Sequence, residues 1–305
     1  MFEKALDAPH IANDEISKYT IAANFYLGEA YYMLGNYQEA IKEYEMSLKA
    51  KPGWIEAIED YVKLLIKCSK TRTAFDKVQQ SVQLYPTNPE LHSLLGSVYL
   101  KQYDFDNAVE SFKKADNYKS DDAKILIGLA ESLEKSDKFE QAAAYASKAH
   151  EILPDDKYIG KKYTHIMLSA NKYDEALEEI NKSIEHEKGK KDPRLLDALA
   201  QYYICTGNEN HAQILFEQIS AINPGYQHHL LEAARRYYQK GDTKNAENYV
   251  NKYNEGKVPL NPAAYNLLGR IAERNGDDRK AMEAFRKGTE GGMVNVQGKK
   301  ETQRL

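Results

Sequence analysis

Eight alanines recur along the chain at an almost constant interval, and this repeat limits the possible folds more than any other feature of the sequence. Successive members are separated by 34, 34, 34, 34, 36, 34 and 35 residues. A period of this length is that of one helical hairpin, which cannot bury its apolar face alone and must stack on its neighbours. The eight residues are Ala40, Ala74, Ala108, Ala142, Ala176, Ala212, Ala246 and Ala281.

Two further columns keep the same register. Apolar residues recur within each unit at spacings of three and four, which is typical of amphipathic helices, and Gly35, Gly207, Gly241, Gly276, Asp137 and Asn171 mark turns between two such stretches. One column of the first helix holds Gly28, Val62, Gly96, Ala130, Thr164, Ala200, Ala234 and Gly269. The position four residues after each alanine holds Tyr44, Val78, Phe112, Ala146, Ile180, Phe216, Val250 and Phe285.

The first unit resembles the tetratricopeptide-repeat (TPR) family, with Asn24 where the family has Trp. It matches the family pattern at Leu27, Gly28, Tyr31, Ala40, Tyr44 and Pro52. The resemblance implies an all-α, right-handed superhelical solenoid of about eight TPR helix-turn-helix repeats, whose first helices line a concave groove. We assign the repeats to residues 21–54, 55–88, 89–122, 123–156, 157–192, 193–226, 227–261 and 262–295, after a partial repeat helix and linker at 1–20 and before a polar, flexible tail at 296–305.

Composition and motifs argue against several functional classes. The net charge is -4, whereas a protein that coats nucleic acid is usually basic. The sequence has no HExxH, GxxxxGK[ST], GxGxxG or GxSxG motif, and no Cys/His cluster has zinc spacing. No apolar run approaches the roughly 18 residues that a membrane span needs. We therefore predict no catalytic residue, no metal, no cofactor, no membrane insertion and a cytoplasmic location.

The first helices supply the residues that we expect to line a partner-binding groove. Those of the first group, in the N-terminal half of the chain, are acidic or aromatic apart from one lysine: Phe25, Tyr26, Glu29, Tyr32, Glu59 and Lys63, with Glu56, Asp60 and Glu90 nearby. Those of the second group are mainly basic: Lys161, Lys162, His165, Arg194, Gln201, His228, Arg235, Tyr238, Asn266, Arg270 and Arg274. Such a bipolar groove would orient a partner with segregated charges. Reversing Arg235 and Arg270 to Glu should then weaken an acidic partner without unfolding the stack.

The chain is therefore predicted to be a non-enzymatic scaffold that binds a peptide or protein segment in the concave groove. A chaperone-tail receptor is rejected, because the positions that would clamp a carboxylate hold Phe25, Glu29, Asp60, Glu90 and Leu94. The alternative is a regulatory or assembly module of a larger enzyme or signalling protein, because Phe2 and Ala5 have the spacing of a second helix. RNA binding, which some helical-hairpin arrays perform, is disfavoured by the charge. Self-association through uncapped solenoid ends is a further possibility.

Overall fold

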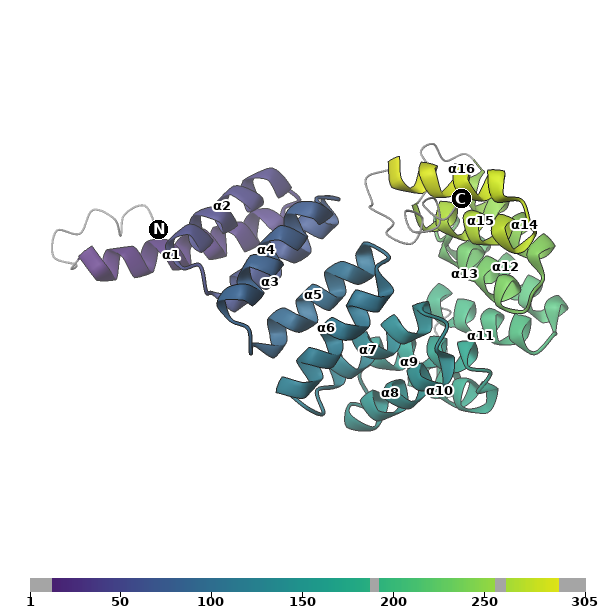
Figure 1. The fold of residues 1–305 in the computed structure, drawn as a ribbon. Coiled ribbons are helices and arrows are strands. Elements are labelled where there is room, and N and C mark those ends of the chain that lie inside the picture. The colour runs from purple at the N-terminus through teal and green to yellow at the C-terminus, as the bar shows by residue number, and fades with distance from the viewer. Residues whose placement is uncertain (1–12, 187–191, 256–261, 291–305) are drawn as a thin grey trace. The chain divides into compact units, whose positions relative to one another are not determined.

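The computed structural model describes residues 13–186, 192–255 and 262–290, and within them it contains sixteen α-helices and no strand (Figure 1). The helices form eight consecutive pairs, so the described chain is an all-α repeat solenoid. In chain order they are α1 (Asn13–Met33), α2 (Tyr37–Ala50), α3 (Ile55–Lys67), α4 (Thr71–Leu84), α5 (Pro89–Lys101), α6 (Phe105–Tyr118), α7 (Ala123–Lys135), α8 (Phe139–Ile152), α9 (Lys157–Ser169), α10 (Tyr173–His186), α11 (Pro193–Cys205), α12 (Glu209–Ile222), α13 (His228–Gln239), α14 (Thr243–Asn254), α15 (Pro262–Arg274) and α16 (Asp278–Glu290).

Each pair turns through one residue with a left-handed backbone. Six of these eight residues are the ones that the sequence marks as turns, and Ser69 and Tyr103 are the two that it does not. The N–H that follows the left-handed residue bonds back over the turn, as from Asn36 to Tyr31 O at 2.9 Å. This is the hydrogen bond that closes a helix C-terminus. The eight residues are Gly35, Ser69, Tyr103, Asp137, Asn171, Gly207, Gly241 and Gly276.

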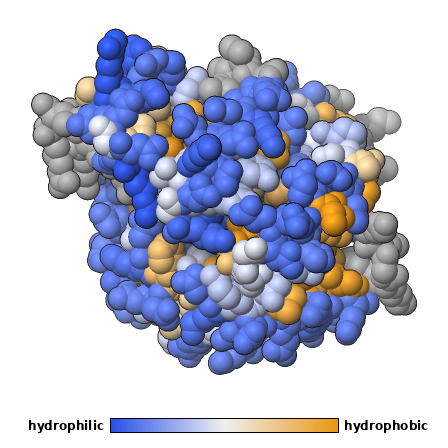
Figure 2. Space-filling view, turned by 90° about the vertical axis from the view of Figure 1, so that its right-hand side faces the viewer, coloured by the Kyte–Doolittle hydropathy of each residue, from blue (hydrophilic) through white to orange (hydrophobic). Residues whose placement is uncertain are grey.

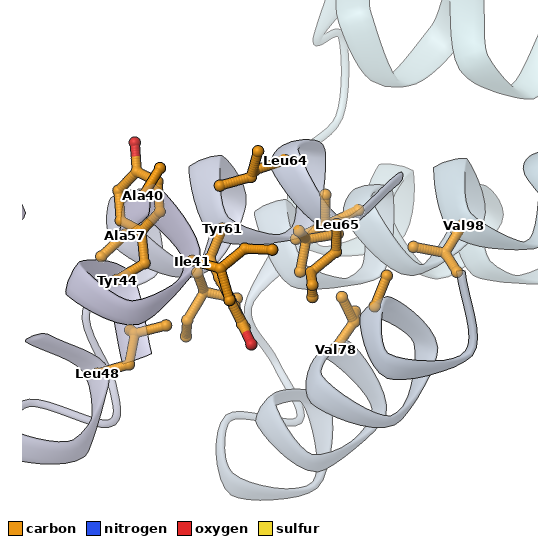
Figure 3. Close-up of a cluster of buried hydrophobic side chains, with 14 of the residues drawn as sticks. Ala40, Ile41, Tyr44, Leu48, Ala57, Tyr61, Leu64, Leu65, Val78 and Val98 are labelled. Atoms are coloured by element: carbon orange, nitrogen blue, oxygen red, sulfur yellow. The ribbon is translucent and has the colours of Figure 1, made fainter. Parts of the chain in front are cut away.

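The alanine column lies in the core of every pair. All eight alanines are between 0% and 5% exposed. The small residues of the first helix face the apolar column of the second helix: a Cβ placed on Gly96 would lie 2.7 Å from the Phe112 ring, and one on Gly28 would lie 3.0 Å from Tyr44. At these two positions glycine fits, because an added carbon would displace an aromatic ring. Figure 3 shows part of this core, with Tyr44 and Tyr61 among the buried side chains.

The chain divides into two compact units. Unit 1 contains residues 1–101 and 110–119, and unit 2 contains residues 102–109 and 120–305. Unit 1 thus holds α1 to α5 and most of α6, while unit 2 holds the start of α6 and all of α7 to α16. The exact repeat boundaries stay a prediction. The expected partial helix near residues 1–12, the insertion near Lys190 and the tail at 296–305 fall outside the described residues.

Candidate partner-binding surfaces

His165 on α9 lies between two buried carboxylates of unit 2. Its Nδ1 is 2.9 Å from Glu134 Oε1 on α7, and its Nε2 is 2.9 Å from Glu232 Oε2 on α13. The two carboxylate side chains are only 3% and 6% exposed. Both ring nitrogens can donate at once only when the imidazole carries two protons. The ring on α9 therefore connects α7, the first helix of the preceding repeat, with α13, the first helix two repeats further on.

Two arginines on α13 complete this arrangement. The Arg235 guanidinium donates from Nη1 to Glu232 Oε1 at 2.6 Å. Arg236, which is 1% exposed, donates from Nη1 to Ser169 Oγ at 2.7 Å and from Nη2 to the carbonyl of His165 at 3.0 Å. Ser169 in turn donates to Glu134 Oε1 at 2.5 Å. We call this set the unit 2 charge network: Glu134, His165, Ser169, Glu232, Arg235 and Arg236.

The carboxylates of the network are held in their charged form. Burial alone would raise the pKa of Glu134, but the neighbouring His165, Lys135 and Arg236 outweigh it and hold that pKa well below the usual range. Burial likewise opposes ionisation of Glu232, and Arg235 and His165 hold its pKa well below the usual range. Hydrogen bonds and opposite charges thus compensate the desolvation of both groups.

Further ion pairs extend along the same face of unit 2. Lys162 Nζ lies 2.7 Å from Glu131 Oε1, joining α9 to α7. Arg270 Nη2 on α15 lies 2.7 Å from Oδ2 of Asp137, which is 133 residues away in the turn after α7. The guanidinium groups of Arg270 and Arg274 also lie over the Tyr238 ring, 5.4 and 5.2 Å from its centroid. The first-helix face of unit 2 is thus largely occupied by its own side chains.

These contacts bear on the second group of expected groove residues, which was described as mainly basic. Acidic side chains lie among its cations, and Gln201 and Asn266 are buried rather than displayed, at 3% and 9% exposure. Lys161, Arg194, His228 and Arg274 remain exposed. Reversing Arg235 and Arg270 would also leave Glu232 beside a second carboxylate. We therefore no longer expect that double variant to leave the fold intact.

The corresponding face of unit 1 is different. Burial, together with the nearby Asp60 and Glu56, raises the pKa of Glu29. The ammonium of Lys63 lies 3.3 Å from both Glu59 and Asp60, and all three side chains are at least 30% exposed. Charged groups here stay in contact with solvent, and acids of neighbouring repeats repel each other.

Aromatic rings lie beside these acids. Tyr26 on α1 is 60% exposed. Lys67 places its ammonium over the rings of Tyr32 and Tyr37, 4.7 and 4.9 Å from their centroids. Phe25 was expected to line the groove, and this prediction is wrong. The residue is 1% exposed, and its ring packs 4.6 Å from that of Trp54, which directly precedes α3. Its side chain is therefore part of the core between two repeats and cannot face a partner.

Two TPR family models match the chain, one over residues 21–153 and one over residues 231–292. The chain belongs to the tetratricopeptide-repeat family. The TPR repeat-containing protein YpiA of Bacillus subtilis (strain 168) is 25% identical to it over 160 residues, which are 52% of this chain and 38% of YpiA. The chain therefore matches well under half the length of this relative.

Solved structures of other TPR proteins share the fold. A TPR protein from Parabacteroides merdae has a TM-score of 0.50 and 17% identity, over 82% of this chain and 97% of that one. A thermophilic TPR protein of Thermus thermophilus has a TM-score of 0.50 and 21% identity, over 61% and 98%. A chain of the APC/C hetero-tetramer Cut9–Hcn1 has a TM-score of 0.53 and 12% identity, over 88% and 52%. TPR arrays are generally protein–protein interaction modules and not catalysts.

The described residues also bear on two other classes of site. No group of three His, Cys, Asp or Glu side chains there is arranged to hold a metal ion. None of the helices there has the length and apolarity that a membrane crossing requires. The face drawn in Figure 2 is mainly hydrophilic, with separate hydrophobic patches.

The acids of unit 2 are the charged residues of this face that the sequence patterns did not identify. Glu131 occupies the same helical position as the expected groove residues His165, Gln201 and Arg235, one residue after the small column. The same position in the fourth repeat is occupied by Glu131. Including that repeat would have identified this acid and its pairing with Lys162 on the first helix of the next repeat. The pairing of His165 with Glu232 spans two repeats, and the periodicity carries no signal for it.

Proposed function

We propose that this TPR chain is a non-enzymatic scaffold that binds a segment of a partner protein on the first-helix face of unit 1. The observation that supports this most is the group of acids on that face. The ammonium of Lys63 is shared between Glu59 and Asp60, 3.3 Å from each, and burial with the nearby Asp60 and Glu56 raises the pKa of Glu29. A basic side chain from a partner would relieve this repulsion. The acids of unit 2 would gain less from a basic partner, because cations of unit 2 already compensate them.

The partner segment suited to this face carries lysine or arginine together with apolar residues. The exposed Tyr26 ring provides an anchor of the kind that dominates binding energies, since tyrosine contributes a large contact area with few rotatable bonds. The acids would accelerate association and select the orientation of the segment. Binding should therefore weaken as the salt concentration rises, because exposed charges are screened.

A charge-neutralising double variant, Glu29→Gln with Asp60→Asn, tests this assignment. The matched control is Glu39→Gln with Asp76→Asn, which removes the same number of charges from positions on α2 and α4. The probe is a short fluorescent peptide of alternating lysine and leucine, with a glutamate–leucine peptide for comparison. We expect the first variant to lose affinity for the basic peptide and the control to keep it. Equal affinity of the two variants would refute the assignment to unit 1.

A regulatory or assembly module of a larger protein is the second candidate. The match to YpiA favours it, because only 38% of that TPR protein corresponds to part of this chain. The sequence of the complete gene would decide between the two.

Single-stranded RNA binding would be recognised by salt-dependent retention of RNA on a filter. A cytoplasmic location stays a prediction.

A further inference from the structure

The outward face of α1 is an exposed apolar surface. From Tyr19 to Leu34, the exposed residues are all apolar except Thr20. Met33 is 82% exposed and Leu34 is 73% exposed. Large residues left in water over four helical turns mark an interaction surface rather than scattered exposure. The exposed apolar residues are Tyr19, Tyr26, Leu27, Ala30, Met33 and Leu34.

The other repeats show what covers this position of a first helix. Tyr61 and Tyr163 occupy the column of Leu27, and each packs against the second helix of the preceding repeat. The Tyr61 ring lies 6.4 Å from that of Tyr44 on α2, and its hydroxyl donates to Glu45 at 2.6 Å. The Tyr163 ring stacks on His150 of α8 at 4.4 Å. The Leu27 column is therefore built to receive another helix, and among the described helices none precedes α1.

The spacing on α1 identifies the helix that fits. α1 has 21 residues, whereas the other helices have 12 to 14, so it extends about two turns further. Ala23 and Ala30 are seven residues apart, which places both on one face two turns apart. Large residues flank these two alanines. The order of large and small residues is the same in both directions from the point between Tyr26 and Leu27, and the six positions are Tyr19, Ala23, Tyr26, Leu27, Ala30 and Leu34.

This symmetry is that of an antiparallel pair of identical helices. A twofold axis between Tyr26 and Leu27 would place Ala23 of one copy opposite Ala30 of the other, and Tyr19 opposite Leu34. Tyr26 would then lie at the axis, so a partner segment anchored on Tyr26 would compete with the second copy. Small residues would then meet where the backbones approach, and large residues would fill the space on either side. We propose that α1 pairs with α1 of a second copy of this chain in an antiparallel dimer.

The charge and size of the face are consistent with a weak dimer. Thr20 is the single polar residue in the exposed set, so bringing two copies together would bury no charge from it. A helical stretch from Tyr19 to Leu34 is about 24 Å long and about 10–12 Å wide, a footprint on the order of 250–300 Å² per copy. Stable interfaces bury roughly 800 Å² per partner. We therefore expect association that depends on concentration, with a dissociation constant in the micromolar range or above.

Sedimentation velocity of the full chain over a concentration series is the first test. Met33→Glu places a charge on the α1 face, while Met46→Glu places the same charge on the exposed side of α2 in the same repeat. We expect the wild type and M46E to associate, and M33E to associate at least about tenfold more weakly. Wild-type chain that stays monomeric throughout the series would overturn the proposal, as would equal association of the two variants.

Cysteine cross-linking tests the register, and it does not depend on M33E being folded. In a background in which Cys68 and Cys205 are replaced by Ser, chains with Ala23→Cys and chains with Ala30→Cys are mixed and oxidised. We expect a cross-linked dimer from the mixture and little from either variant alone, because two copies of the same residue would lie about 10 Å apart along the helix axis. Equal cross-linking of all samples, or dimerisation only after removal of residues 1–12, would contradict the α1 pairing.

Discussion

Units 1 and 2 are built from the same kind of repeat, each with its own buried core, yet the acidic residues of their first-helix faces have opposite pKa shifts. In unit 1 the pKa of Glu29 is raised, because burial and the neighbouring acids Asp60 and Glu56 disfavour its charge. In unit 2 the pKa values of Glu134 and Glu232 are held well below the usual range, although both side chains are more deeply buried. The difference lies in the neighbours: unit 2 supplies cations and hydrogen-bond donors, and unit 1 supplies more acid.

The contrast indicates which face is available to a partner. Removing one member of a compensated buried network leaves the remaining buried charges with fewer partners, so that network is expected to hold the fold. An exposed and repelling group of acids contributes little to the fold, and gains most when a cation arrives from outside. The same residue type thus has a structural role in unit 2 and a proposed recognition role in unit 1. The four predictions below test this division, starting with the largest expected effect.

Replacing His165 by Ala should be the most damaging change. It would leave the carboxylates of Glu134 and Glu232 buried without the ring that joins them, which costs about 3–5 kcal/mol in comparable cases. Hydrogen–deuterium exchange should show loss of protection in α9 and α13 but not in α1 or α3. The control in unit 1 is Lys63→Ala, which removes an exposed ion pair and should cost less than about 1 kcal/mol. Similar losses from both variants would remove the distinction between the units.

Acid should weaken the same network without a mutation. A group whose pKa is depressed in the folded state stabilises the fold above its unfolded pKa of about 4.3, and this contribution is lost as the pH falls through the folded value. Protonation of Glu134 and Glu232 should therefore remove their stabilising contribution to unit 2 as the pH falls below about 4. The effect of Glu29 on stability has the opposite sign. Because its pKa is raised in the folded state, protonation of this carboxylate at lower pH favours the folded state. Amide exchange followed from neutral to acidic pH should thus show loss of protection in unit 2 before unit 1.

The core should respond equally in both units. Ala74 in unit 1 and Ala142 in unit 2 occupy the same column and are both 0% exposed. Replacing either by Leu overpacks a close helix contact and should cost about 1–3 kcal/mol. Denaturant unfolding of the two variants would measure this. A clear difference between them would mean that the units differ in packing as well as in charge.

The sequence was sufficient for the fold because the fold depends on local periodicity. The alanine column marks buried positions in all eight pairs, and the glycines together with Asp137 and Asn171 mark six of the eight turns. Ser69 and Tyr103 were missed as turns, since neither residue type favours a left-handed backbone. Their conformation is imposed by the repeat itself.

The candidate sites were predicted less well because they depend on how successive repeats rotate. His165 meets Glu232 at 2.9 Å across two repeats, and Arg270 meets Asp137 at 2.7 Å over 133 residues. Neither contact follows from the position of a residue within its own repeat. Phe25 was placed on the surface by counting from the start of its repeat, but Trp54, which directly precedes the first helix of the next repeat, covers it. Contacts between repeats therefore decide which first-helix residues remain accessible.

The smallest expected change in stability belongs to the charges of unit 1. Glu59→Gln should alter the free energy of unfolding by less than about 1 kcal/mol, because the Glu59–Lys63 pair is exposed on both sides and screened by salt. The same substitution should nevertheless slow the association of a basic peptide at low salt, since it removes a charge that steers the encounter. Stopped-flow association measured at two salt concentrations separates these effects. A variant that loses stability but keeps its association rate would mean that Glu59 supports the fold, and the recognition role of unit 1 would then rest on Glu29 and Asp60 alone.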